Sequence, residues 1–220
     1  MHQVSDPSIL YFGTPVVLIS TLNEDESPNL APISSIFWLG WRCTIGISAF
    51  SKTTENILRN GEAVLNLPSV HEAEAVNRLA LTTGSDPVPE GKRQKGYRHE
   101  KFKFETSGLT PVASHLVRPP RVSECPVQME VSLATSHGIA DDHPQIRGKL
   151  LTLELKVMRV HLDESILMDG YANRVDPVKW RPLIMSFQEL FGLGEKVQKS
   201  KLAGIEEHLY RSPETPVLRQ

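Results

Sequence analysis

Cysteine and aromatic residues are scarce in this chain. Of its 220 residues, 2 are cysteines and 6% are aromatic. Cys43 and Cys125 lie far apart, and neither belongs to a Cys-x-x-Cys pair. A disulfide framework or a zinc site of the usual spacing is therefore not predicted. The simpler interpretation is two reduced thiols that pack as small apolar side chains.

The chain also has no excess of charge of either sign. Its 24 Lys and Arg and 26 Asp and Glu give a formal net charge of -2. A nucleic-acid partner is not expected, because binding a polyanion needs clustered cations. The one basic run, residues 91–103, is interpreted as a loop. The chain has neither a secretory signal nor a run of ~18 apolar residues, so we expect no membrane partner and a cytoplasmic location.

Several catalytic motifs are missing as well. The sequence contains no Gly-x-Gly-x-x-Gly after its first predicted strand, no Gly-Lys-Ser/Thr phosphate loop and no Gly-x-Ser-x-Gly elbow. These absences argue against the common nucleotide-binding loops and against a serine hydrolase. The eight histidines do not fall at metal-ligand spacing, so no metal site is predicted. No catalytic side chain can be named from these patterns.

Strand-forming segments dominate what is present. Residues 15–34 are predicted to form a strand, a turn and a second strand: residues 16–20 are a β-branched apolar run, and a polar turn follows at 23–27. Residues 43–49 are predicted to be the third strand, and residues 62–68 a further strand after a short helix. Residues 127–131 and 151–157 alternate between apolar and polar side chains, which predicts two half-buried antiparallel strands. Because no helix-length crossover separates the first three strands, a meander or barrel is expected.

Two short helices are predicted between these strands. Residues 55–59 follow the capping candidates Ser51, Thr53 and Thr54 and precede Gly61, a typical helix stop. A second helix is predicted within residues 71–84 from the helical spacing of its apolar side chains. Residues 85–121 are rich in Pro, Gly and charge and are predicted to be irregular. The chain beyond residue 168 is expected to hold one helix and a frayed end.

Small hydroxyl and amide side chains gather at strand ends in the first third of the chain. The set comprises Asn29, Ser34, Ser35, Ser48, Ser51, Thr53, Thr54 and Asn56. The start of a helix suits a phosphate monoester, because its free N–H groups and its dipole favour an anion. Plain helix capping explains the same hydroxyls, and Asn29 after Pro28 is also typical of a turn. Both interpretations stay open at this level.

Three separated motifs occur in a characteristic order. They are TPVVLISTLNEDESPNLAPISSIFWLGW at residues 14–41, SKTTENILRNGEAVLNLPS at 51–69 and GLTPVASHLVRPPRVSECPVQMEV at 108–131. Together they resemble the flavin reductase-like, FMN-binding split-barrel family over roughly residues 8–165. The resemblance implies a mainly β fold with a few short helices, an antiparallel Greek-key split β-barrel spanning residues 8–165. Residues 166–220 would be a C-terminal extension that packs on the barrel or on a dimer partner.

The resemblance also implies a non-covalent FMN site. The residues expected at the ring system or the ribityl chain are Asn29, Ala31, Ser34 and Ser35. The backbone of Ser48, Ala49 and Phe50 would run beside the cofactor, and the flavin phosphate would lie near Ser51, Lys52, Thr53, Thr54 and Asn56. These residue types suit a flavin, which needs amide donors and acceptors, apolar walls and an anion site.

Two further groups carry alternative interpretations. Trp38 and Trp41 could stack on the flavin, or they could anchor the core or a subunit interface. The loop residues Lys92, Arg93, Lys95 and His99 pass near the flavin by resemblance, or they remain solvated surface. The sequence alone does not choose between these interpretations.

The function implied by the resemblance is oxidoreduction by a homodimer. Electrons would pass from NAD(P)H to FMN and then to free flavin, oxygen or a partner oxygenase. The family's Asp-His-x-Ile-x-x-Gly motif, associated with nicotinamide use, is only approximated here by residues 142–148, which carry Pro144 in a loop-like setting. An FMN-binding electron carrier or flavin store without NAD(P)H activity is therefore the alternative. A third is a barrel that has lost its flavin and serves as a binding module.

Overall fold

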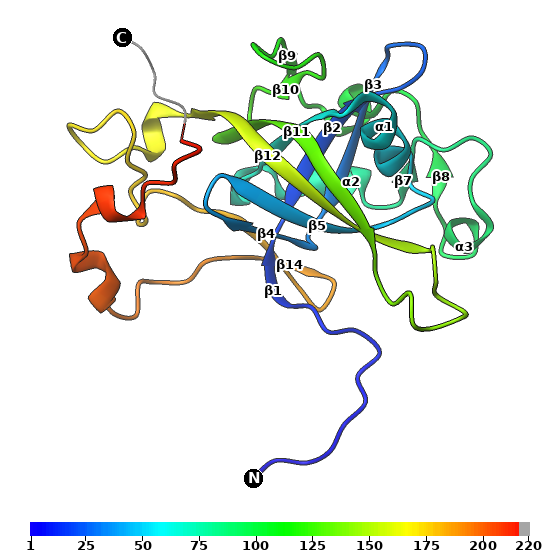
Figure 1. Ribbon diagram of the computed structural model, residues 1–220, viewed down its shortest axis with the longest axis horizontal. Coiled ribbons are helices and arrows are strands. Elements are labelled where there is room, and N and C mark those ends of the chain that lie inside the picture. Colours follow the sequence, from blue (N-terminus) through cyan, green and yellow to red (C-terminus); the bar gives the residue numbers. More distant parts are fainter. Residues whose placement is uncertain (216–220) are drawn as a thin grey trace.

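A seven-stranded antiparallel sheet forms the centre of the molecule (Figure 1), as seen in a computed structural model that describes residues 1–215. Its strand order is β3-β2-β6-β11-β12-β5-β4. The strands are β2 (Val17–Leu22), β3 (Pro28–Ile33), β4 (Ile36–Leu39), β5 (Arg42–Ser48), β6 (Glu62–Leu67), β11 (Val127–Gly138) and β12 (Leu150–Leu162). Because β6 returns to lie beside β2, the order along the sheet differs from the order along the chain, as in a Greek key. The expected mainly β, antiparallel class is confirmed.

The long hairpin of β11 and β12 runs diagonally through the sheet (Figure 1). The alternation of β12 is as predicted, with Leu153 and Leu155 fully buried. For β11 the prediction was wrong on one face, because Gln128 and Glu130 are also buried. Residues 113–118 fold over that face, as the hydrogen bonds to Glu130 show. Such a cover cannot be read from the alternation of a single strand.

Two helices lie where the sequence predicted them. Helix α1 (Lys52–Asn60) begins at Lys52, three residues earlier than expected, because Ser51 is its N-cap and accepts a hydrogen bond from the Thr54 N–H at 3.1 Å. Gly61 ends the helix in the left-handed conformation, with φ of 71°, which glycine adopts without steric cost. The 3₁₀ turn η1 (Val70–Glu72) leads into helix α2 (Ala73–Leu79).

The segment predicted to be irregular contains short ordered elements. They are α3 (Glu90–Arg93), β8 (Arg98–His99), α4 (Lys103–Ser107), β9 (Pro111–Val112) and β10 (Arg121–Val122). Strand β8 pairs with β7 (Thr82–Thr83), which lies just before this segment, at the end of the range in which the second helix was predicted. Helix α4 is the main departure, since Phe104 is buried in the same apolar cluster as Val76 and Leu79 of α2. A five-residue helix gains little from local propensity, so tertiary packing of this kind is what stabilises α4.

The helix predicted beyond residue 168 is wrong for residues 168–215. This stretch forms the hairpin β13 (Leu183–Ser186) and β14 (Glu189–Gly192), followed by the 3₁₀ turns η3 (Lys201–Gly204) and η4 (Glu207–Tyr210). An earlier 3₁₀ turn, η2 (Glu164–Ile166), follows β12. Strand β13 also pairs with β1 (Phe12–Pro15) near the start of the chain. The backbone N–H and C=O groups of β13 therefore bond to distant strands, whereas in a helix they would bond to one another.

Two apolar clusters form the core. The first is built on Ile45, Leu65 and Leu153 of the sheet, and both Trp38 and Trp41 pack against it. The second joins Leu18 and Leu30 to α2 and α4. No helix within residues 1–215 is long and apolar enough to cross a membrane.

Candidate functional site

A cavity of about 250 Å³ lies between β3, β5, the start of α1 and the segment that follows α2. Seven of the twelve residues predicted for the site line it: Asn29, Ala31, Ser35, Ser48, Ser51, Lys52 and Thr53. Apolar wall is supplied by Ile33 and Ile47. The cavity therefore combines hydroxyl, amide and apolar surface within one enclosure.

The first turn of α1 presents free hydrogen-bond donors at this cavity. Ser51 Oγ caps the Thr54 N–H, and Thr54 Oγ1 donates to the Ser48 carbonyl at 2.7 Å. Within the helix, the first-turn N–H groups of Lys52 and Thr53 have no partner. The positive end of the helix dipole adds to these donors, so the turn favours an anion.

Asn29 lines the same cavity, and its amide oxygen is covered and unpaired. Its side chain is 2% exposed, and Nδ2 donates to Thr21 Oγ1 and Thr53 Oγ1, both at 3.3 Å. Within residues 1–215 its Oδ1 is buried without a hydrogen-bond partner. Asn29 lies inside β3 opposite Thr21, so it does not mark a turn. A buried amide oxygen left unpaired is costly, which makes a ligand donor at this point favourable.

Gly84 lets the backbone approach this amide closely. A Cβ built on Gly84 would lie 2.6 Å from Asn29 Oδ1 and 3.0 Å from Lys52 Cγ. Contacts below 3.0 Å require a neighbour to move, so a larger residue at position 84 would displace the Asn29 side chain. The cavity therefore depends on a small residue here.

Five predicted residues lie off the cavity lining: Ser34, Ala49, Phe50, Thr54 and Asn56. Asn56 is fully buried and donates to Thr21 Oγ1 and Asn23 Oδ1, each at 3.0 Å. This amide fastens α1 to β2 and the turn that follows. Thr54 is occupied by the helix cap, while Phe50 is exposed. Trp38 and Trp41 are likewise absent from the lining.

Sequence reasoning missed one wall of the cavity. This wall consists of Ala80, Thr82, Thr83, Gly84, Tyr97 and Lys103. Lys92, one of the loop residues that the resemblance places near the flavin, also lines it. Arg93 is instead paired with the exposed Glu90, and His99 lines a neighbouring depression. The basic run was the available signal, but burial of one lysine within it is a tertiary property.

Lys103 is the least expected member of that wall. Its side chain is 2% exposed, and burial lowers the pKa of Lys103 to about 7, with the charge of Lys92 acting in the same direction and Glu100 against it. Burial also lowers the pKa of Lys92. The Lys92 Nζ donates to Thr83 Oγ1 at 3.1 Å. Two ammonium groups therefore share one wall of the cavity.

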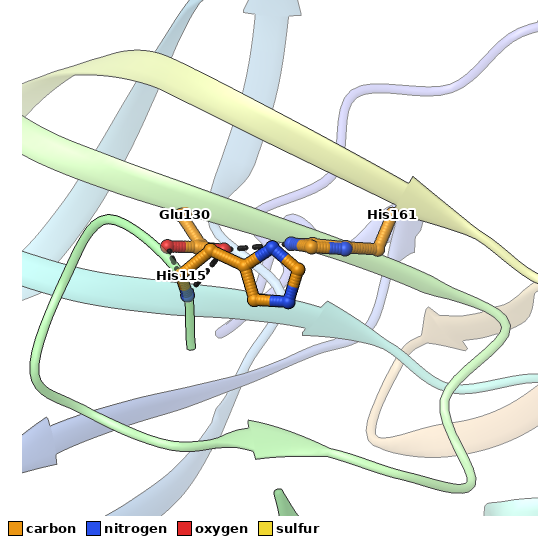
Figure 2. Close-up of side chains that lie close together, drawn as sticks. All are labelled: His115, Glu130 and His161. Atoms are coloured by element: carbon orange, nitrogen blue, oxygen red, sulfur yellow. Dashed lines mark hydrogen bonds and ion pairs between the residues drawn. The ribbon is translucent and has the colours of Figure 1, made fainter. Parts of the chain in front are cut away.

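A separate cluster joins His115, Glu130 and His161 (Figure 2). Glu130 accepts hydrogen bonds from the His161 ring at 2.6 Å and from the backbone N–H groups of His115, Leu116 and Val117. Burial raises the pKa of Glu130, but these hydrogen bonds outweigh it and hold the pKa below its usual value. Desolvation lowers the pKa of His161 against the pull of that carboxylate.

This cluster has the residue types of a metal site, and one atom from each residue lies within 4.8 Å of the others. Several of the atoms that would bind a metal already accept hydrogen bonds. Both Glu130 oxygens accept N–H groups, and the Arg159 guanidinium donates to His115 Nδ1 at 2.8 Å. A guanidinium at that nitrogen opposes a cation. The cluster therefore fits an anchor that holds residues 113–118 on β11 and β12.

Comparison with known proteins places this geometry in context. The sequence model of the flavin reductase like domain family matches residues 9–175. The uncharacterized protein YdfE of Bacillus subtilis (strain 168) is 37% identical over 194 residues, covering 88% of this chain and 90% of YdfE. Two solved structures share the fold. Flavoredoxin of Desulfovibrio vulgaris (Miyazaki F) has a TM-score of 0.72 at 23% identity, covering 93% of this chain and 100% of its own. Nitrilotriacetate monooxygenase component B from Bacillus cereus has a TM-score of 0.69 at 19% identity, covering 87% and 89%. The expected split-barrel fold is confirmed.

Proposed function

The chain belongs to the flavin reductase like domain family, and from this premise we propose that it binds FMN non-covalently in the cavity and is an NAD(P)H-dependent oxidoreductase. The observation that carries the proposal is the cavity itself. It brings together the unpaired Asn29 Oδ1, the open first turn of α1 and apolar wall from β3 and β5. These are the three kinds of surface that a flavin mononucleotide requires.

The donor and acceptor set fits the cofactor part by part. The Asn29 amide suits the pyrimidine edge, whose ring N–H is a donor for an unpaired oxygen. Ser35 and Ser48 offer hydroxyls along the middle of the cavity. The N–H groups at Lys52 and Thr53 suit a phosphate monoester. FMN carries one such phosphate, which favours it over riboflavin.

When bound, the flavin supplies hydride and single-electron transfer, and the chain's own residues bind and orient it. Asn29 holds the ring edge, and its Nδ2 is itself fixed by Thr21 and Thr53. The backbone at Gly84 packs against that amide and leaves no space for a side chain there. No side chain is assigned as nucleophile or general acid.

A specific observation favours the second candidate, an FMN-binding electron carrier or store without its own NAD(P)H activity. The segment that approximates the nicotinamide-associated motif, residues 142–148, lies in the loop between β11 and β12. His143 is exposed there and does not line the cavity. The nicotinamide step therefore has less support than flavin binding. A barrel without flavin is the third candidate.

The assembly and the acceptor are part of the same proposal. Strand β4 ends the sheet and exposes Phe37 and Leu39, at 59% and 81%, which supports a homodimer formed over this edge. The similarity to nitrilotriacetate monooxygenase component B supports a partner oxygenase as the electron acceptor. Free flavin is the alternative acceptor. Cys43 and Cys125 are free and buried, which fits a cytoplasmic location.

Purification with FMN analysis tests the proposal directly. We expect a yellow protein that releases FMN on denaturation and oxidises NADH or NADPH faster than free FMN does. A Ser35→Trp variant should lose FMN, because Ser35 lines the cavity. Ser34→Trp is the matched control, since Ser34 is off the lining, and it should retain FMN.

The outcomes separate the candidates. A wild-type protein with no affinity for FMN would exclude both flavin-dependent functions and leave the binding module. FMN binding without turnover above the free-FMN background would support the electron carrier. Equal loss of FMN in Ser35→Trp and Ser34→Trp would mean that the cofactor does not occupy this cavity.

A further inference from the structure

The buried side of helix α1 is mainly polar. Its buried residues are Thr53, Thr54, Asn56 and Ile57, and of these Ile57 belongs to the apolar core. A helix on a sheet normally packs through an apolar stripe. Apolar contacts are non-directional, whereas hydrogen bonds tolerate only small changes in distance and angle. Hydrogen bonds therefore set the position of α1 on the sheet more than they do for an ordinary amphipathic helix.

Asn56 is the centre of these hydrogen bonds. It is fully buried and lies off the cavity lining. Its Oδ1 accepts from the Arg59 guanidinium at 2.9 Å, and its Nδ2 donates to Thr21 Oγ1 and Asn23 Oδ1, each at 3.0 Å. Because a guanidinium can only donate, Arg59 fixes which side of the Asn56 amide carries the oxygen. The Nδ2 hydrogens therefore face β2 and the turn after it.

Thr21 Oγ1 is the atom through which this network reaches the cavity. It accepts from Asn56 Nδ2 at 3.0 Å and from Asn29 Nδ2 at 3.3 Å. Asn29 Nδ2 also donates to Thr53 Oγ1, in the first turn of α1, at 3.3 Å. All four side chains are at most 4% exposed. The Asn29 amide and the first turn of α1 thus belong to one buried network that has Asn56 on its far side.

We propose that Asn56 is a positioning residue that sets the spacing between the Asn29 amide and the first turn of α1. The proposal rests on the proposed function, in which these two groups bind the ring edge and the phosphate of one FMN molecule. A ligand held at both ends binds tightly only when the two ends of its site have the matching separation. Asn56 lies at neither end, so its effect should appear in the advantage that the phosphate gives FMN over riboflavin.

Folding stability alone does not call for these polar side chains. Replacing both partners of a buried hydrogen bond by apolar groups of the same shape can be nearly neutral, and leucine and valine are close in shape to asparagine and threonine. A satisfied buried polar network instead specifies one arrangement of the groups that it joins. The contacts of Asn56 and Thr21 therefore fit a role in the geometry of the cavity.

Titrations of FMN and riboflavin into Asn56→Leu and into the double variant Asn56→Leu/Thr21→Val test this role. We expect the ratio of the riboflavin Kd to the FMN Kd to fall roughly tenfold in both, as for the loss of about one hydrogen bond. The double variant should unfold near the wild-type urea midpoint. Asn60→Leu is the matched control, because Asn60 lies in the same helix and also donates to β2, at the Leu22 carbonyl, at 3.0 Å. Its ratio should equal that of wild type.

The outcomes are distinct. An unchanged ratio in a folded Asn56→Leu protein overturns the proposal, as does an equal fall in Asn60→Leu. Equal losses of affinity for FMN and riboflavin also overturn it, because they report a general loosening of the cavity. If Asn56→Leu fails to fold, Thr21→Val is compared with Thr21→Ser, which keeps the hydroxyl. The ratio should fall in Thr21→Val and stay at the wild-type value in Thr21→Ser, and equal ratios in the two variants overturn the proposal.

A failure of the proposed function would be recognised separately, as a wild-type chain that binds neither flavin. The network is then tested in the ligand-free protein by urea denaturation of Asn29→Ala, Asn56→Leu and their double variant. Because Asn29 and Asn56 are joined through Thr21 Oγ1, their effects should not add. Asn60→Leu combined with Asn29→Ala should give additive effects. Additive effects for Asn56→Leu as well would overturn the positioning role.

Discussion

Replacing Lys103 by methionine should stabilise the ligand-free protein. The wild-type chain holds the Lys103 ammonium at 2% exposure without an ion pair among residues 1–215, whereas methionine has a similar length and no charge. The fall of the Lys103 pKa from 10.5 to about 7, at about 1.4 kcal/mol per pH unit, corresponds to a cost of at most about 5 kcal/mol. Water entering the cavity relaxes part of that cost, so we expect a gain of about 2 kcal/mol.

The pH dependence has a definite sign. Because the folded-state pKa of Lys103 lies below its unfolded value, the unfolded chain binds more protons between pH 7 and 10.5. The cost is complete below pH 7 and fades as the pH rises through that window. The charged groups that act on Lys103 are Lys92 and Glu100, and both are kept in the variant. The stability gap between Lys103→Met and wild type should therefore be largest below pH 7 and close towards pH 10.5.

Urea denaturation of both proteins across this pH range measures the gap directly. Lys95→Met serves as the control, since its side chain is exposed and should give a change within about 0.5 kcal/mol at every pH. Equal stabilities of Lys103→Met and wild type below pH 7, or a gap that does not change with pH, would refute the reasoning.

Three further predictions follow from single contacts. Gly84→Ala should lower FMN affinity with little loss of stability, because its Cβ would lie 2.6 Å from the Asn29 amide oxygen. Gly91→Ala is the control, since open space surrounds Gly91, and it should bind FMN as wild type does. Equal FMN affinities in the two variants would contradict this prediction. Glu130→Gln should cost roughly 1–3 kcal/mol in urea, since it leaves buried N–H groups without a carboxylate. Because the pKa of Glu130 is held low, the loss of unfolding free energy in Glu130→Gln should be present above the usual carboxyl pKa and disappear in acid. A difference between variant and wild type that does not change with pH would argue against this prediction. Ser51→Ala should cost about 1 kcal/mol through the lost α1 cap, and an unchanged denaturation midpoint would show that another group caps the helix.

The sequence by itself determined the sheet and the helix at the cavity. Residues 16–20 are a short apolar run rich in β-branched side chains and followed by a polar turn, and residues 151–157 alternate between apolar and polar side chains, so these strands were predicted from local pattern. The cap at Ser51 and the stop at Gly61 are equally local, since each acts on backbone groups within one turn. The motif order identified the family and the strand-end residues that meet at the cavity.

Two features depended on the tertiary structure: the cavity wall that contains Lys103, and the burial of the β11 face that carries Glu130. Lys103 and Phe104 form a short helix because α2 packs against it, and a sequence window cannot report a partner some thirty residues away. Glu130 reads as the solvent side of an alternating strand, yet residues 113–118 close over it. Burial of a charge depends on what the rest of the chain places around it, so the burial of Lys103 in the cavity wall could not have been predicted from the sequence alone.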